Sequence, residues 1–167
     1  MSNAARLMQA GAHMVKLEGG EWLADTVKML TERGIPVCAH LGLTPQSVNK
    51  FGGFRVQGRS DAQAQQIIAD AKAMDAAGAD LMVLECVPSE LAAKVTAAVG
   101  MATIGIGAGA STNAQVLVIN DILGLTEQPP KFSKNFLLET ADIPSALAKY
   151  VADVKNGVFP TEAQEFS

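Results

Sequence analysis

The feature that most restricts the fold of this chain is a repeated alternation of short apolar runs with segments of helical periodicity. Five apolar runs are predicted as strands, at residues 13–17, 35–39, 80–85, 102–106 and 115–120. Helices are predicted between and around them, at residues 4–10, 21–33, 61–77, 89–99 and 143–155. Because the runs are mostly apolar, both faces of each strand are expected to be buried, which is typical of a parallel sheet covered by helices. The pattern predicts one α/β domain over residues 4–167.

Five strands leave two architectures open. An open doubly wound sheet accommodates them directly, whereas an eight-stranded barrel needs three more strands and about 250 residues. Residues 1–3 are left out of the fold prediction, because the opening Met-Ser-Asn-Ala resembles a remnant of an expression vector.

Composition excludes several classes of protein. A net charge of −4 argues against a nucleic-acid-binding protein, which needs a basic surface. No stretch approaches the roughly 20 apolar residues of a membrane span, and no secretion signal opens the sequence. The two cysteines, Cys38 and Cys86, lie in strand-like runs and are expected to be reduced and buried. We therefore expect a cytoplasmic protein without nucleic-acid or membrane partners.

Ionisable side chains stand at the expected ends of three strands. Lys16 and Glu18 close the first apolar run, His40 follows the second, and Glu85 ends the third. Lys16 and Glu18 are two residues apart, so on a strand they point to the same face. Because ligands bind at the carboxyl ends of parallel strands, these side chains are expected to form one site. The structural alternatives are a solvated ion pair for Lys16 and Glu18 and a hydrogen-bonded core histidine for His40.

Six ordered motifs identify a resemblance to a known family. They are VKLEGG (15–20), PVCAHLGLTPQ (36–46), FGGFRVQGR (51–59), LECVP (84–88), IGIGAG (104–109) and PKFSKNF (130–136). In this order they resemble ketopantoate hydroxymethyltransferase, and the resemblance covers residues 4–167. It implies a (β/α)₈ barrel of the phosphoenolpyruvate/pyruvate superfamily, with strands 4 to 8 present. The first three strands, which carry two metal-binding aspartates in the family, have no counterpart in this chain.

The resemblance also implies a reaction and its participants. The enzyme transfers a one-carbon unit from 5,10-methylenetetrahydrofolate to 3-methyl-2-oxobutanoate, giving 2-dehydropantoate for pantothenate and coenzyme A biosynthesis. By residue matching, Glu85 is the catalytic base, Lys16 and His40 bind the substrate, and Glu18 lies at a Mg²⁺ ion that stabilises the enolate. The family implies a homo-oligomer, a decamer when intact.

Two other functions remain open from the sequence. One is an inactive fragment with a role in assembly only, which the missing aspartates favour. The other is a different magnesium-dependent enolate lyase or mutase of the same superfamily, although the Lys-Lys-Cys-Gly-type motif of those enzymes is not found. The basic residues of the long loop at 41–60, Lys50, Arg55 and Arg59, are either solvated or contact the glutamate tail of the folate.

Overall fold

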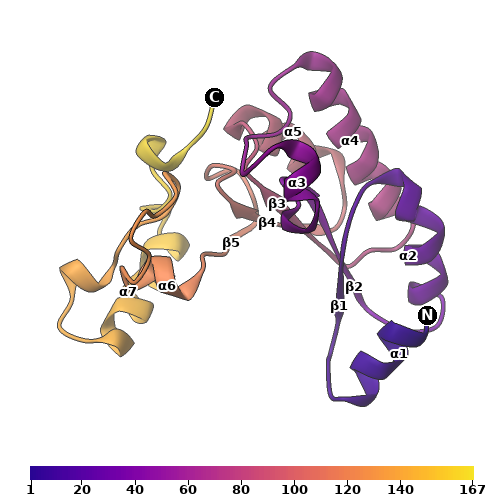
Figure 1. Cartoon of the computed structure of the whole chain (residues 1–167), viewed down its shortest axis with the longest axis horizontal. Helices are drawn as coiled ribbons and strands as arrows, with labels where there is room; N and C mark the ends of the chain where they lie inside the picture. The colour runs from indigo at the N-terminus through magenta and orange to yellow at the C-terminus, as the bar shows by residue number, and fades with distance from the viewer.

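A five-stranded parallel sheet forms the centre of the computed structural model, which describes all residues, 1–167 (Figure 1). Its strands are β1 (Val15–Glu18), β2 (Val37–Gly42), β3 (Leu81–Glu85), β4 (Ala102–Ile106) and β5 (Ala114–Gln115). They lie in the sheet in the order in which they occur along the chain, and every neighbouring pair is parallel.

The helices connect and extend this sheet. The α-helices are α1 (Ser2–Gln9), α2 (Ala24–Thr31), α3 (Val48–Phe51), α4 (Asp61–Ala76), α5 (Ser89–Ala98), α6 (Ile119–Ile122) and α7 (Ile143–Lys155). Four 3₁₀ turns accompany them: η1 (Glu21–Leu23), η2 (Pro45–Ser47), η3 (Leu137–Glu139) and η4 (Glu162–Gln164). None of the helices is both long and apolar enough to cross a lipid bilayer.

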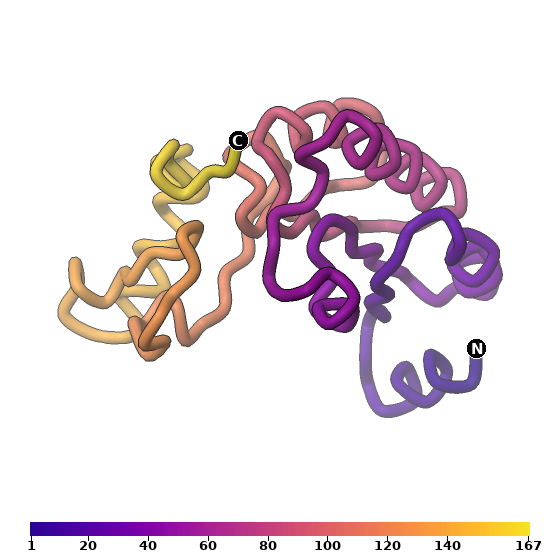
Figure 2. Tube along the Cα trace, turned by 45° about the horizontal axis from the view of Figure 1, so that its top comes forward, coloured from indigo at the N-terminus to yellow at the C-terminus, as the bar shows by residue number.

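The strand order decides between the two architectures. In a doubly wound sheet the strand order reverses, and helices cover both faces. Here the order never reverses, and right-handed crossovers then place successive helices on one face. Helices α2, α4 and α5 pack against that face in one core cluster, and both views show them curving around it (Figures 1 and 2). This is the arrangement of a segment of a (β/α)₈ barrel, so the predicted fold class is confirmed.

The main core lies between the sheet and these helices. Met82 and Leu84 of β3 are fully buried there, together with Met74 of α4 and Val95 of α5. On the opposite face of β3, Val83 is only partly buried. The prediction that both faces of the strands are buried is therefore wrong for this strand, because helices cover only one face.

The fifth predicted strand is mostly wrong. Only Ala114–Gln115 is a strand, and the backbone N–H of Val116 adds one more hydrogen bond, to the carbonyl of Gly105. Val118 then caps helix α6, which replaces the predicted end of the strand. Strand β5 pairs with β4 alone, so the β-branched residues that follow have no second strand to pair with, and Val116 and Val118 remain exposed.

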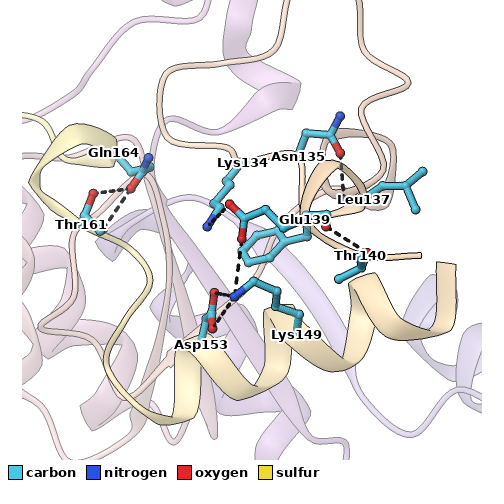
Figure 3. A network of polar contacts seen from close by, with 10 residues as sticks. Lys134, Asn135, Leu137, Glu139, Thr140, Lys149, Asp153, Thr161 and Gln164 are labelled. Carbon is cyan, nitrogen blue, oxygen red and sulfur yellow. Dashed lines mark hydrogen bonds and ion pairs between the residues drawn. The ribbon is translucent and has the colours of Figure 1, made fainter. Parts of the chain in front are cut away.

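Residues after β5 form a small unit with a core of its own, at the side of the sheet (Figure 1). Phe136 is fully buried, and its ring meets the rings of Tyr150 and Phe159 edge to face, with centroids 5.4 Å apart in both pairs. Polar contacts brace the same unit: Lys149 of α7 is paired with Glu139 and with Asp153 (Figure 3). The edge-to-face geometry is the favoured one for aromatic rings.

Candidate functional site

The sheet register brings the four predicted residues together. Glu18 at the end of β1 is the direct neighbour of His40 on β2. His40 in turn lies opposite Val83 on β3, and Glu85 is two residues further along that strand. Since alternate residues of a strand share a face, all four side chains lie on the face that the helices do not cover.

Their side chains form a continuous chain of contacts, which we call the tetrad (Lys16, Glu18, His40 and Glu85). Lys16 Nζ donates a hydrogen bond to Glu18 Oε1 at 2.8 Å and lies 3.1 Å from His40 Nδ1. His40 Nε2 lies 3.0 Å from Glu85 Oε2 on the other side of the ring. The predicted convergence is confirmed, with the imidazole in the middle.

Glu18 is held more firmly than an ordinary strand-end carboxylate. Its side chain is 6% exposed, and Oε2 accepts a hydrogen bond from the backbone N–H of Gln46 at 3.0 Å. Burial raises the pKa of the Glu18 carboxyl, but the bonds from Lys16 and Gln46 outweigh burial and hold this pKa below its usual value. The solvated ion pair is therefore not what the structure shows.

His40 and Glu85 retain unused bonding capacity. The His40 side chain is 4% exposed, and its Nε2 is close to the Glu85 carboxylate without the alignment of a hydrogen bond, so this buried nitrogen has no hydrogen-bond partner. A buried polar atom left without a partner is costly, so its presence in a folded protein calls for a reason such as a bound ligand or water. A ligand oxygen beside this ring would satisfy it.

The backbone around Glu85 is closely packed. Gly42 has φ +84°, and a Cβ there would overlap the carbonyl oxygen of Glu85. That same carbonyl accepts a hydrogen bond from the N–H of Leu43 at 2.8 Å. Cys86, the next residue, has a left-handed φ of +47°, a rare conformation for a residue with a side chain. These constraints fix where strand β3 ends and hence where Glu85 points.

The tetrad by itself does not fit a magnesium ion. No group of three or more His, Cys, Asp or Glu side chains is placed to hold a metal. Both oxygens of Glu18 already accept hydrogen bonds, one of them from the ammonium group of Lys16, which repels a second cation. The role of Glu18 as a metal ligand thus remains a prediction that the residues of this chain do not support.

A cavity beside the tetrad was not foreseen from the sequence. It has a volume of about 360 Å³ and lies between helix α4 and the loops that follow β1 and β2, with Glu18 at its edge. Its polar lining includes Gln57, from the loop before α4, and Gln63, Gln66 and Asp70 of α4 itself. Only their spacing in the predicted helix at 61–77 is a signal of this site, since Gln63, Gln66 and Asp70 recur at three and four residues.

None of the three basic loop residues forms an ion pair, and only Arg59 forms a side-chain hydrogen bond. Lys50 and Arg55 are exposed and make no ion pair within 4 Å, whereas Arg59 donates from Nε to the backbone oxygen of Ser167 at 3.3 Å. The structure therefore separates Arg59 from the other two.

Comparisons with known proteins agree on one family. A family model described as ketopantoate hydroxymethyltransferase matches residues 1–162. A 3-methyl-2-oxobutanoate hydroxymethyltransferase of Saccharophagus degradans is 75% identical over 166 residues, which are 99% of this chain and 62% of the relative. One of Stutzerimonas stutzeri is 59% identical over 169 residues, or 100% of this chain and 64% of the relative.

The chain thus spans less than two thirds of the length of these curated relatives. A crystal structure of dihydrodipicolinate synthase from Agrobacterium tumefaciens superposes with a TM-score of 0.44 and 20% identity, over 70% of this chain and 40% of that one. That likeness is too weak to add to the assignment. On the match of the family model to nearly its whole length, the chain belongs to the ketopantoate hydroxymethyltransferase family.

Proposed function

We propose that this chain carries the substrate-binding and proton-transfer residues of a hydroxymethyltransferase that acts on 3-methyl-2-oxobutanoate. The observation that carries the proposal is the tetrad: an ammonium group, an imidazole and two carboxylates on one face of adjacent strands. The names of the relatives and the family model support this reaction over the other enolate enzymes of the superfamily.

Lys16 is proposed to bind the anionic keto acid. Its ammonium group is the tetrad's only permanent cation, and its side chain is 47% exposed, so it is accessible to a ligand. A fixed positive charge beside the substrate oxygens also stabilises the negative charge that develops when the enolate forms. The unpartnered Nε2 of His40 provides a second polar contact for the same substrate.

Glu85 is proposed to be the base. Its side chain is 15% exposed, so the carboxylate is largely shielded from water while part of it stays accessible to a substrate. It would take the proton from C3 of the keto acid, and the electron pair of the broken C–H bond enters the enolate. The enolate carbon then bonds to the methylene carbon of 5,10-methylenetetrahydrofolate as one C–N bond breaks, and the oxygen of water replaces the second nitrogen on that carbon. The proton held by Glu85 and one proton of the water go to the two nitrogens, and tetrahydrofolate leaves.

Magnesium and oligomerisation belong to the family resemblance rather than to this chain's own geometry. Because the tetrad alone does not fit the metal, the steps above use only the chain's side chains. The free edges of β1 and β5 suit association with further strands or subunits, since unpaired strand edges favour pairing. We propose that the full-length protein is a homo-oligomer.

The test is proton exchange in the full-length protein that contains this segment. Glu85→Gln keeps the shape of the side chain and removes the base, so exchange of the C3 proton for deuterium, followed by NMR, is expected to slow about 10²–10⁴-fold. Binding of the keto acid, measured by calorimetry, is expected to persist.

The matched control is Glu90→Gln, the same chemical change at an exposed position of helix α5. It is expected to leave exchange unchanged. Exchange at the wild-type rate in Glu85→Gln would show that another group is the base.

A further inference from the structure

We propose that the cavity between α4 and the loops after β1 and β2 binds the uncharged, N–H-rich bicyclic ring of the one-carbon donor, a pteridine. We call it the α4 cavity; it is lined by 15 residues, among them Glu18, Trp22, Gln63 and Asp70. The inference rests on the proposed function, because only that function calls for a pteridine donor. It adds the place where the donor's ring binds.

The position and size of the α4 cavity suit such a ring. Its volume of about 360 Å³ falls in the range of small-molecule sites, about 300–1,000 Å³. Glu18 belongs both to the lining of this cavity and to the tetrad. A ligand bound in the cavity is therefore adjacent to the residues proposed to form the enolate.

The charges of the lining exclude the keto acid and favour a donor-rich neutral group. Two carboxylates, Glu18 and Asp70, line the cavity, and no lysine, arginine or histidine does. Like charges repel, so an anion is disfavoured there and is drawn to Lys16 instead. A ring with adjacent N–H groups can instead donate to a carboxylate and to the amide oxygens of glutamines.

Asp70 has an oxygen available for this purpose. Its Oδ1 accepts hydrogen bonds from the backbone N–H of Glu21 at 2.9 Å and from Gln66 Nε2 at 3.1 Å. Its Oδ2 accepts none from the protein, and the side-chain amide of Gln63 is likewise unbonded. The two bonds to Oδ1 fix the Asp70 carboxylate. Oδ2 and the Gln63 amide are left to bind a ligand that carries hydrogen-bond donors.

A flat apolar surface borders the same cavity. Trp22 lies against Gly19, where a Cβ would come within 2.9 Å of the indole Cε2, and the side chain is still 77% exposed. Exposed apolar side chains indicate a binding site when they lie together rather than singly. Trp22, Phe51 and Ile67 line the cavity together and offer apolar surface to the faces of a planar ring.

Two exposed basic residues lie close in sequence to the cavity residue Phe51. Lys50 precedes the lining residue Phe51 in helix α3, Arg55 follows it by four residues, and both are exposed and without ion pairs. They complement the glutamate tail of a folate, which the acidic cavity itself would repel. Arg59 is not part of this arrangement, because it contacts Ser167.

The test uses the fact that Trp22 is the chain's only tryptophan. The 167-residue chain is titrated with 5-formyltetrahydrofolate, a stable reduced folate, and Trp22 emission is followed, with N-acetyltryptophanamide correcting for absorbed light. We expect saturable quenching. Gln63→Ala should raise the Kd about 3- to 10-fold, the loss of one hydrogen bond, and Asp70→Asn about 10-fold or more, because the acceptor is charged.

The matched control is Gln65→Ala, the same change at an exposed residue of α4 that does not line the cavity. It should leave the Kd unchanged, and thermal unfolding of each variant shows that it is folded. Absence of quenching, or equal weakening by Gln65→Ala and Gln63→Ala, overturns the inference.

A parallel calorimetric titration with 3-methyl-2-oxobutanoate separates this inference from the proposed function. Keto-acid binding that is lost in Lys16→Met and kept in Gln63→Ala upholds the substrate site even if the folate fails to bind. Folate binding that depends on Gln63, with keto-acid binding indifferent to Lys16→Met, supports the cavity and refutes the substrate site.

Discussion

Replacing Gly42 by alanine tests how the fold holds the end of strand β3. Gly42 has φ +84°, and an added Cβ would overlap the backbone carbonyl oxygen of Glu85 and come within 2.8 Å of Val87 Cγ1. The first of these contacts is with backbone, which cannot rotate away as the end of a flexible side chain can. The substitution therefore combines backbone strain with a collision.

The magnitude follows from these two costs. A left-handed conformation costs a residue with a side chain about 1–2 kcal/mol, and the stiffer unfolded chain returns about 0.4–1 kcal/mol. Forcing an extra methyl group into packed surroundings adds about 1–3 kcal/mol. Gly42→Ala is thus expected to lower the free energy of unfolding by about 2–4 kcal/mol.

Gly34 supplies the control. It has a similar φ of +75° after helix α2, but no atom lies within 4 Å of an added Cβ. Gly34→Ala carries the strain without the collision, so a loss of only about 1 kcal/mol is expected. The difference between the two variants isolates the close approach of Gly42 to Glu85.

Urea unfolding of the 167-residue chain, followed by circular dichroism and by Trp22 fluorescence, measures both variants by linear extrapolation. Keto-acid binding gives a second readout, since movement of the Glu85 backbone is expected to weaken it in Gly42→Ala and not in Gly34→Ala. Equal losses of stability in the two variants would refute the reasoning, because the collision would then contribute nothing.

Two further predictions concern titratable groups. The hydrogen bond from Lys134 holds the pKa of Glu139 below its usual value, so its stabilising contribution is present above about pH 4.5 and is lost as the pH falls through the lowered pKa. Urea unfolding between pH 7 and pH 3 should therefore show a smaller loss of stability in Glu139→Gln than in the wild type, and added salt should reduce the difference. Burial raises the pKa of the Cys86 thiol to about 12, with a smaller effect from the charge of Glu85, and burial also raises that of Cys38. Neither thiol is expected to react with iodoacetamide at pH 8 until urea unfolds the chain, and modification of Cys86 in the folded protein, seen by mass spectrometry, would contradict its burial.

Local sequence patterns were sufficient for most of the elements. The strands at 80–85 and 102–106 and the helices at 61–77 and 143–155 were predicted within one residue of their bounds. Apolar periodicity specifies such elements because each is long enough to show its period within one segment. The shared face of Lys16 and Glu18 is also local, since alternate residues of any strand point the same way.

The sequence pattern gave a wrong prediction where a segment's structure depends on contacts with distant parts of the chain. Residues 115–120 have the composition of a strand, yet a strand persists only as long as a partner pairs with it, and β5 lies at the edge. The helix predicted at 21–33 begins only at Ala24, and Trp22 precedes it in a 3₁₀ turn, where it is largely exposed. Neither the short β5 nor the exposure of Trp22 can be predicted from the residues of its own segment.

The candidate site was likewise predictable from the sequence only in part. Strand ends and sequence spacing placed the tetrad's residues at one edge of the sheet, but the order of contacts, with His40 between Lys16 and Glu85, follows from the pairing register of three separate strands. The α4 cavity could not be predicted from any one segment, because its walls come from a helix and two loops. Distances between such segments are set by packing of the core, which depends on the whole chain and not on any one stretch of it.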